Sequence, residues 1–176
     1  MIAAIVGPSG AGKDLLIAGA QALEPRLRLA RRVITRPSDA GGEDFEGVTE
    51  AAFARMQAEG RFALDWRAHG LAYGIPHDQL EAPGPVIFNG SRAALPQVIA
   101  RLPGLRVVLV TAPVALLAQR LAARGRETEA DIATRLDRAG FQMPPGIAHA
   151  TVVNDGTPEE GAARLLAALP PASAAR

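Results

Sequence analysis

The chain has 176 residues, enough for one domain with a well-buried core and short for two. Its formal net charge of +1 gives no overall field toward nucleic acid or membranes, and the lack of cysteine excludes disulfides and cysteine-ligated metals. The longest apolar run, residues 107–118, is too short to span a bilayer, and signal-peptide cleavage would remove a glycine-rich motif that begins at Gly7. We therefore expect a cytoplasmic protein without nucleic-acid or membrane partners.

The first predicted elements are a buried strand over residues 2–6 and a helix over residues 14–23, joined by a glycine-rich loop. The loop has the spacing G-x-x-x-x-G-K of a phosphate-binding loop and consists of Gly7, Pro8, Ser9, Gly10, Ala11, Gly12 and Lys13. In this order of elements, backbone N–H groups and the helix N-terminus converge on an anion. Lys13 is the one lysine beside 18 arginines, and its compact ammonium can reach β- and γ-phosphate oxygens. The segment predicts ATP binding.

Asp14 follows the lysine, at a position where the hydroxyl of Ser or Thr usually ligates Mg²⁺. A carboxylate is also a hard oxygen donor that can hold Mg²⁺ directly or through water. Alternatively, Asp14 is a first-turn acid that the helix dipole favours. Both interpretations stay open at this point.

Strand-like and helix-like segments alternate along the rest of the chain. Strands are expected over residues 33–35, 85–89, 105–110 and 150–153, and a helix is expected over residues 50–59. The last helix starts at Thr157, which forms a capping-box pattern with Glu160, and Pro158 takes the first helical position. Such repeated units predict an α/β fold: a central parallel sheet with helices on both faces and ligands at the carboxyl ends of the strands.

A hairpin interrupts this alternation, with strands over residues 62–66 and 71–75 around His69-Gly70. We interpret the region of about residues 37–76 as a small inserted lobe that holds a second substrate. Residues 1–170 are expected to form a single domain, followed by a flexible tail over residues 171–176.

Arginines cluster in the second half of the chain, in a segment of about residues 120–140. Arg120 and Arg124 share a helix face, Arg126 follows after one glycine, and Arg135 and Arg138 lie on the next helical segment. This pattern suits a mobile lid that closes over phosphates, with Arg120, Arg124 and Arg135 as candidate catalytic cations and Arg126 as a nucleotide contact. The alternative is a solvated basic face.

Three further side chains are candidate contacts for an acceptor phosphate. Arg36 follows the second predicted strand, Arg92 follows the strand that ends at Asn89, and Tyr73 is the only tyrosine of the chain. A structural role is the alternative for each of them.

With these residues in place, the chain resembles the guanylate-kinase-like group of P-loop kinases over residues 7–155. The matching segments are residues 7–13, Thr35-Arg36-Pro37, Gly42-Glu43-Asp44-Phe45, Tyr73-Gly74, the arginines of the lid and Val152-Val153-Asn154-Asp155. The chain departs from true guanylate kinases where they recognise guanine and its phosphate. Ser38 and Asp39 stand in the region of a second arginine, Phe45 replaces a tyrosine, Ile75 replaces a serine, and Asn89-Gly90-Ser91 replaces Asp-x-Asp.

The departures instead resemble the family of ribose 1,5-bisphosphate phosphokinases (PhnN) of bacterial phosphonate catabolism, in residues 12–14, 33–37, 40–44, 69–76 and 89–92. This resemblance implies a P-loop kinase fold and transfer of the ATP γ-phosphoryl group to ribose 1,5-bisphosphate, with Mg²⁺, giving 5-phosphoribosyl 1-diphosphate (PRPP) and ADP. It also implies nucleotide contacts for Asn154 and Asp155, and acceptor contacts for Arg36, Tyr73, Asn89 and Arg92.

The implied chemistry fits the residues, because the attacking oxygen belongs to a phosphate that is already ionised near neutral pH and needs no general base. Lys13, Mg²⁺ and the lid arginines would offset the repulsion between two polyanions. Three alternatives remain: a nucleoside monophosphate kinase acting on GMP or another nucleotide, a non-catalytic guanylate-kinase-like binding module, and a regulatory P-loop ATPase.

Overall fold

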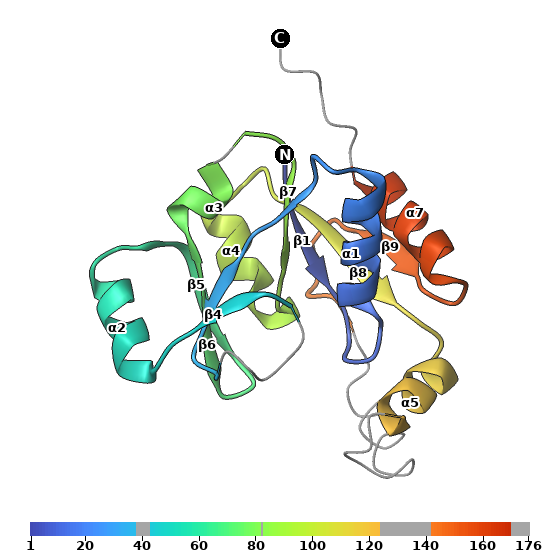
Figure 1. Cartoon of the computed structure of the whole chain (residues 1–176), viewed down its shortest axis with the longest axis horizontal. Helices are drawn as coiled ribbons and strands as arrows, with labels where there is room; N and C mark the ends of the chain where they lie inside the picture. Colours follow the sequence, from blue (N-terminus) through green and yellow to red (C-terminus); the bar gives the residue numbers. More distant parts are fainter. Residues whose placement is uncertain (38–42, 82, 124–141, 170–176) are drawn as a thin grey trace.

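A computed structural model of the chain describes residues 1–37, 43–81, 83–123 and 142–169. Their strands form two sheets, a five-stranded sheet and a four-stranded sheet (Figure 1). Helices α1 and α7 lie beside the five-stranded sheet, and α2 lies at the far end of the four-stranded sheet (Figure 1). Among the described residues, no helix combines the length and apolar character needed to cross a membrane.

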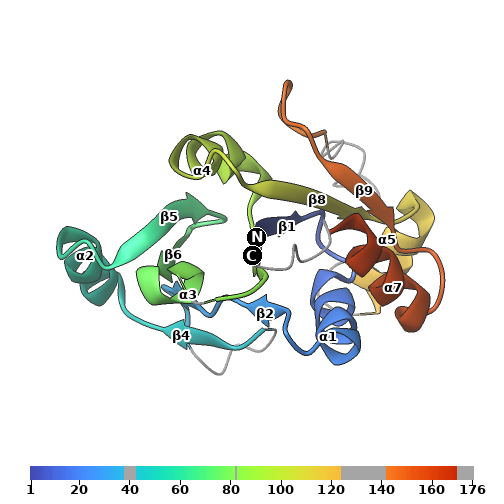
Figure 2. The ribbon, with the colours of Figure 1, turned by 90° about the horizontal axis from the view of Figure 1, so that it is seen from above.

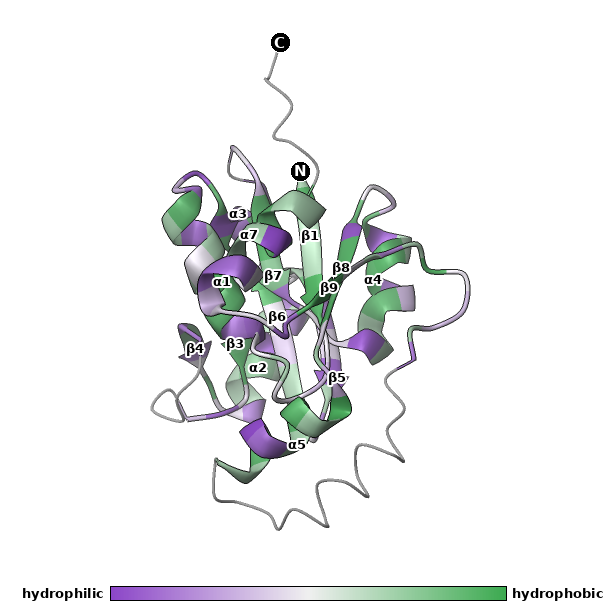
Figure 3. Cartoon of the chain, turned by 90° about the vertical axis from the view of Figure 1, so that its right-hand side faces the viewer, coloured by the Kyte–Doolittle hydropathy of each residue, from purple (hydrophilic) through white to green (hydrophobic). Residues whose placement is uncertain are grey.

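The five-stranded sheet is parallel throughout, with strand order β2-β7-β1-β8-β9. Its members are β1 (Ile2–Val6), β2 (Arg28–Leu29), β7 (Val86–Asn89), β8 (Arg106–Thr111) and β9 (Ala150–Val153). The inner strands are hydrophobic along most of their length (Figure 3), as expected for strands that are covered on both faces. The register pairs Ile5 with Asn89 and Val6 with Leu109, so the carboxyl ends of three strands meet at one edge.

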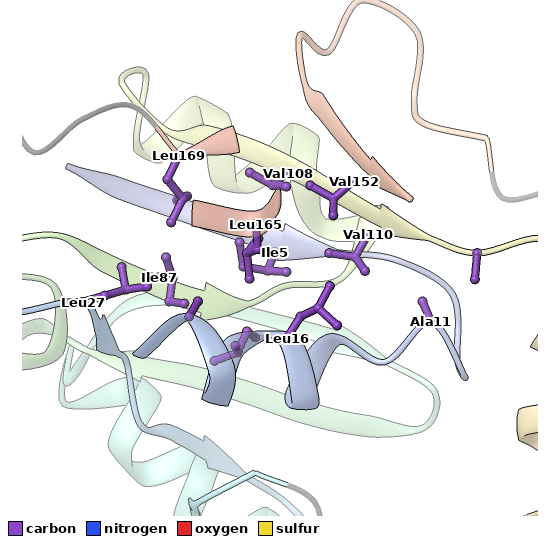
Figure 4. Close-up of a cluster of buried hydrophobic side chains, with 14 of the residues drawn as sticks. Ile5, Ala11, Leu16, Leu27, Ile87, Val108, Val110, Val152, Leu165 and Leu169 are labelled. Atoms are coloured by element: carbon purple, nitrogen blue, oxygen red, sulfur yellow. The ribbon is translucent and has the colours of Figure 1, made fainter. Parts of the chain in front are cut away.

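Successive residues of β1 face opposite sides of the sheet and enter two different cores. Ala3 and Ile5 pack into the core under α1 (Lys13–Leu23) and α7 (Pro158–Ala168), together with Leu16 and Leu165 (Figure 4). The two helices approach closely, since a Cβ added at Gly19 would lie 2.7 Å from the Cβ of Ala162. Because Gly19 in the middle of α1 has no side chain, α1 and α7 can both pack against the same face of the central sheet.

The opposite face of the central sheet is covered by α4 (Leu95–Arg101), which follows a 3₁₀ turn (Arg92–Ala94), and by the second sheet (Figure 2). Ala4 and Val6 of β1 enter this core. Helix α5 (Val114–Ala122) follows β8, and its buried Leu117 joins the core on the α1 side. The sheet thus has helices on both faces, as predicted.

The second sheet has strand order β4-β3-β6-β5 and is built from β3 (Arg32–Ile34), β4 (Phe45–Gly47), β5 (Phe62–Ala68) and β6 (Leu71–Pro76). Strands β5 and β6 form an antiparallel hairpin whose two turn residues, His69 and Gly70, have φ angles of 51° and 75°. Two positive φ angles are typical of a type I′ turn, which matches the twist of the strands. Helices α2 (Glu50–Ala58) and α3 (His77–Glu81) flank this sheet.

The two sheets share one hydrophobic core, because Leu64, Trp66 and Ile75 of the hairpin pack with Val86 and Phe88 of β7. A separate small core lies under α2, where Phe53 stacks on Phe62 with ring centroids 4.7 Å apart. The second sheet is therefore anchored to the central sheet through apolar side chains.

The predicted α/β class with a central parallel sheet is confirmed, and so are the hairpin and the capping box at Thr157. The strand expected over residues 33–35 begins and ends one residue earlier. Three short elements, β2, β4 and α3, were not predicted. Most of the expected lid, residues 124–140, lies outside the described residues, and so does the tail from residue 170. The division into lobe, lid and single domain stays a prediction.

Candidate nucleotide-binding site

A cleft of about 640 Å³ lies at the carboxyl edge of the central sheet, in front of the glycine-rich loop. Its walls come from elements far apart in the sequence: the loop itself, the first turn of α1, the end of β7, α5 and the segment after β9. The lining residues are Ser9, Gly10, Gly12, Lys13, Asp14, Leu15, Asn89, Arg120, Ala123, Asn154, Gly156 and Pro158. The structure thus brings together most of the phosphate loop, Asp14, Asn89, Arg120 and Asn154 from the predicted site.

The loop can adopt its conformation only with glycine at particular positions. Gly12 precedes α1 with a φ of 83°, in the left-handed region, and a Cβ there would lie 2.5 Å from Nδ2 of Asn154. Gly7 is as crowded, since a Cβ would lie 2.0 Å from the carbonyl oxygen of Val110. The loop therefore lies directly against its neighbours, with its backbone at the cleft.

Lys13 begins α1, and its side chain turns back over the loop. Its Nζ donates hydrogen bonds to the carbonyl oxygens of Gly7 (3.0 Å) and Pro8 (3.2 Å). The positive end of the α1 dipole and the Lys13 ammonium therefore act on the same space. This is the arrangement that binds a phosphate anion.

Asn154 is 3% exposed and supports the loop through hydrogen bonds. Its Nδ2 donates to the carbonyl oxygen of Ala11 (2.8 Å), and its backbone N–H donates to the carbonyl oxygen of Thr111 (2.7 Å). Arg120 Nη2 donates to the backbone oxygen of Asn154 (3.2 Å), whereas Arg120 Nη1 is buried and has no hydrogen-bond partner among the described residues. A buried guanidinium N–H at the edge of an anion-binding cleft is suited to an anionic ligand.

A buried polar network connects the cleft to the second sheet. Asn89 Nδ2 donates to Oδ1 of Asp14 (2.8 Å) and to Oε2 of Glu43 (3.1 Å). Glu43 forms an ion pair with Arg32, and Arg32 Nη1 also donates to the backbone oxygen of Asn89 (2.7 Å). The guanidinium of Arg32 lies over the ring of Tyr73, 5.0 Å from its centroid.

Arg32 and Glu43 were not predicted as site residues. Their partners lie 11 and 57 positions away along the chain, beyond any local pattern. One local signal was present: Arg32 directly precedes the buried residues Val33 and Ile34. An arginine beside buried residues needs a partner for its charge.

The predicted acceptor contacts do not all meet at the cleft. Asn89 lines it, but Arg36, Tyr73 and Arg92 are absent from its lining. Arg36 lies over the ring of Phe45, 4.4 Å from its centroid, and Arg92 donates to the backbone oxygen of Gln142 (2.9 Å). Tyr73 stacks on Trp66 with centroids 5.5 Å apart and an interplanar angle of 6°. Their role in acceptor binding stays a prediction.

Asp155 is exposed and also lies outside the cleft lining. Its Oδ1 accepts a hydrogen bond of 2.6 Å from Arg164, and this bond holds the pKa of the Asp155 carboxyl below its usual range. Its predicted contact with a nucleotide is not visible in this arrangement. The remaining predicted cations, Arg124, Arg126, Arg135 and Arg138, lie outside the described residues.

Comparison with known proteins identifies close relatives along most of the chain, although no family model matches it. Ribose 1,5-bisphosphate phosphokinase PhnN of Agrobacterium fabrum is 43% identical over 171 residues, which cover 94% of this chain and 93% of that protein. The PhnN protein of Pseudomonas fluorescens is 53% identical over 142 residues, which cover 76% and 73% of the two chains.

A longer relative also matches. The bifunctional ribose 1,5-bisphosphokinase-thymidine phosphorylase of Cupriavidus necator is 52% identical over 169 residues, 94% of this chain. The matched residues make up 28% of that protein, so this chain spans little more than a quarter of its length.

A solved structure supports the fold. The guanylate kinase from Anaplasma phagocytophilum superposes with a TM-score of 0.67, over 95% of this chain and 82% of that one, at 18% identity. At that identity the likeness concerns the fold alone. The identities of 43% and 53% along most of both PhnN proteins carry the stronger conclusion. The chain belongs to the ribose 1,5-bisphosphate phosphokinase PhnN family.

Proposed function

We propose that the chain transfers the γ-phosphoryl group of ATP to the 1-phosphate of ribose 1,5-bisphosphate, giving PRPP and ADP. The observation that carries this proposal is the cleft itself, in which Lys13 and the N-terminus of α1 face the same space as Asp14 and Asn89. The names of the PhnN relatives support ribose 1,5-bisphosphate as the acceptor. We place the reaction in the cytoplasm, where ATP is available.

In this proposal the protein contributes positioning and positive charge. The loop backbone and Lys13 would hold the β- and γ-phosphates, while Arg120 lines the same cleft beside the loop and its buried Nη1 would donate to an anion. Two unit charges 4 Å apart repel by about 4 kcal/mol at an effective dielectric constant of 20, so bringing two polyanions together needs such cations. The acceptor phosphate is itself the nucleophile, and no side chain has to remove a proton from it.

Mg²⁺ is the metal that such a reaction uses, and the residues fit it. Among the described residues, no group of three or more His, Cys, Asp or Glu side chains forms a metal site made by protein alone. Mg²⁺ usually needs only one or two carboxylates beside the substrate phosphates and water. Asp14 supplies a carboxylate at the cleft, next to Lys13. When bound, Mg²⁺ would neutralise charge on the phosphates.

We further propose that the second sheet and the segment at the end of β7 form the acceptor side of the site, with Arg36, Tyr73, Asn89 and Arg92 toward ribose 1,5-bisphosphate. A sugar bisphosphate has no base, which agrees with the replacement of base-recognising residues by Ile75 and Asn89. Asn154 would act on ATP indirectly, through the loop that it supports.

The deciding experiment is a turnover assay with ATP and Mg²⁺, with ribose 1,5-bisphosphate and GMP as parallel acceptors and with ADP and acceptor product measured together. We expect PRPP with the sugar bisphosphate and no GDP with GMP. Formation of GDP would identify a divergent guanylate kinase instead. ADP release without either product would point to an ATPase, and no ADP release with bound nucleotide would point to a binding module.

A further inference from the structure

Asp14 and Asn89 follow or end two neighbouring strands of the central sheet, β1 and β7, and meet at the cleft. Asp14 lies in the first turn of α1, directly after the loop, and Asn89 ends β7, which pairs in parallel with β1. Their side chains share a hydrogen bond of 2.8 Å from Asn89 Nδ2 to Asp14 Oδ1. Both line the space in front of Lys13.

In many P-loop enzymes the corresponding pair has the opposite chemistry. A neutral Ser or Thr follows the lysine, an aspartate comes from a second strand, and the two hold Mg²⁺ together. Here the carboxylate follows the lysine as Asp14, and the neutral side chain is Asn89, at the end of a neighbouring strand.

We infer that the charged and the neutral partner of the Mg²⁺ site have exchanged places in this chain. Asp14 supplies the negative charge of the site, and Asn89 is a positioning residue that orients the Asp14 carboxylate. The inference rests on the proposed ATP- and Mg²⁺-dependent reaction.

The surroundings of Asn89 explain why position 89 is neutral. The second hydrogen of its amide goes to Oε2 of Glu43, 3.1 Å away. The Glu43 side chain is 6% exposed and is held by Arg32, so its carboxylate is fixed beside Asn89. An aspartate at position 89 would place a third carboxylate against Asp14 and Glu43 without any hydrogen to donate to them. A carboxylate at position 14 therefore requires a donor at position 89.

The hydrogen bond also leaves Asp14 able to bind a cation. A carboxylate has about four acceptor sites on its two oxygens, and Asn89 occupies one of them.

The test compares nucleotide affinity with and without metal in four proteins: wild type, Asp14→Ser, the triple variant Asp14→Ser/Glu43→Gln/Asn89→Asp and the control Asp78→Asn. A non-hydrolysable ATP analogue is titrated calorimetrically in saturating Mg²⁺ and again in EDTA. The dissociation constant in EDTA divided by that in Mg²⁺ reports how much the metal contributes to nucleotide affinity. Circular dichroism and thermal unfolding verify that each variant is folded.

For Asp14→Ser we expect this ratio to fall by at least about tenfold, the usual scale for losing a residue at a metal site. The affinity in EDTA should stay equal or improve, because a negative charge beside the phosphates is removed. Adding Asn89→Asp together with Glu43→Gln should restore the ratio to within about threefold of wild type, because the charge returns from the other side of the pair and the introduced glutamine can donate to it. Asp78→Asn, which changes an exposed carboxylate on α3 outside the cleft, should leave the ratio unchanged.

Two results would overturn the inference. An unchanged ratio in Asp14→Ser would leave Asp14 as a first-turn acid, and a folded triple variant without recovery would disprove the exchange. If the triple variant does not fold, Asn89→Ala decides: it keeps the charge of Asp14 and loses only the orientation, so a loss as large as that of Asp14→Ser would contradict the assigned roles.

The acceptor is absent from this titration, which separates it from the test of the overall reaction. A restored ratio together with inactivity toward ribose 1,5-bisphosphate would disprove the acceptor and leave the exchanged metal pair in place. The converse result, PRPP formation without recovery of the ratio, would disprove the exchange alone.

Discussion

Replacement of Arg32 by methionine tests how strongly the polar network stabilises the junction of the two sheets. The side chains of Arg32 and Glu43 are 12% and 6% exposed, so they form a largely buried ion pair. Arg32→Met keeps an unbranched side chain against Trp66 and Tyr73 but leaves Glu43 buried without its cation. The variant therefore isolates the electrostatic part of the contact.

The expected loss follows from the burial of the pair. Removing one partner of a buried pair costs about 3–5 kcal/mol, and we expect the lower end, about 3 kcal/mol, because Asn89 still donates to Glu43. For a domain of this size each kcal/mol lowers the unfolding midpoint by about 2–4 °C, so the midpoint should fall by about 6–12 °C. In Arg32→Met/Glu43→Gln no charge stays buried, and the loss should shrink to about 1 kcal/mol or less.

Urea unfolding measures these differences directly. Trp66 is the only tryptophan and lies 6.0 Å from the Arg32 guanidinium, so its fluorescence follows the junction itself, while circular dichroism follows the whole fold. The reasoning is refuted if Arg32→Met stays within 1 kcal/mol of wild type. It is equally refuted if the double variant is no more stable than the single one.

Three further variants test the site and its support. Lys13→Ala should abolish turnover at an unchanged unfolding midpoint, and near-normal turnover would contradict the phosphate loop. Asn154→Ala leaves the carbonyl oxygen of Ala11 without its donor, so thermal unfolding should show a loss of about 1–3 kcal/mol together with a higher KM for ATP. If both values stay at wild type, the loop does not depend on that bond. The pKa of Asp155 is lowered by Arg164, so their pair stabilises the fold above the unfolded pKa of about 3.9 and loses this effect as the pH falls through the lower folded value. Asp155→Asn should therefore be less stable than wild type at pH 7, with a difference that shrinks in urea titrations as the pH is lowered below about 3.9; a constant difference would exclude this cause.

The central sheet was predictable because its inner strands are continuous apolar runs, as in residues 2–6 and 107–110. Strand β2 has two residues of intermediate burial, Arg28 and Leu29, and offers no run to detect. Strand β4 has three residues and lies next to charged neighbours, Glu43 and Asp44. Both short strands form because neighbouring strands, β7 beside β2 and β3 beside β4, supply the hydrogen bonds, and the sequence of the short strand does not contain that information.

The candidate site was likewise predictable only in part. The loop and Lys13 are contiguous, so the spacing of their residues predicts their common place at the cleft. The orientation of single side chains depends on contacts across the fold: Arg36 lies over Phe45, and Tyr73 stacks on Trp66. Both pairs form within the second sheet, through the pairing of β3 with β4 and of β5 with β6, and helical or strand periodicity does not describe them.

The order of the central strands has a consequence for how the chain folds during synthesis. Strand β1 leaves the ribosome long before its neighbours β7 and β8, which begin at Val86 and Arg106. At about 5–20 residues per second the first strand waits several seconds for a partner. Its residues Ala3 to Val6, fully buried in the final fold, stay exposed in the meantime. The phosphate loop is thus translated early but completed late, and the nascent chain has reason to engage chaperones before it can bind a nucleotide.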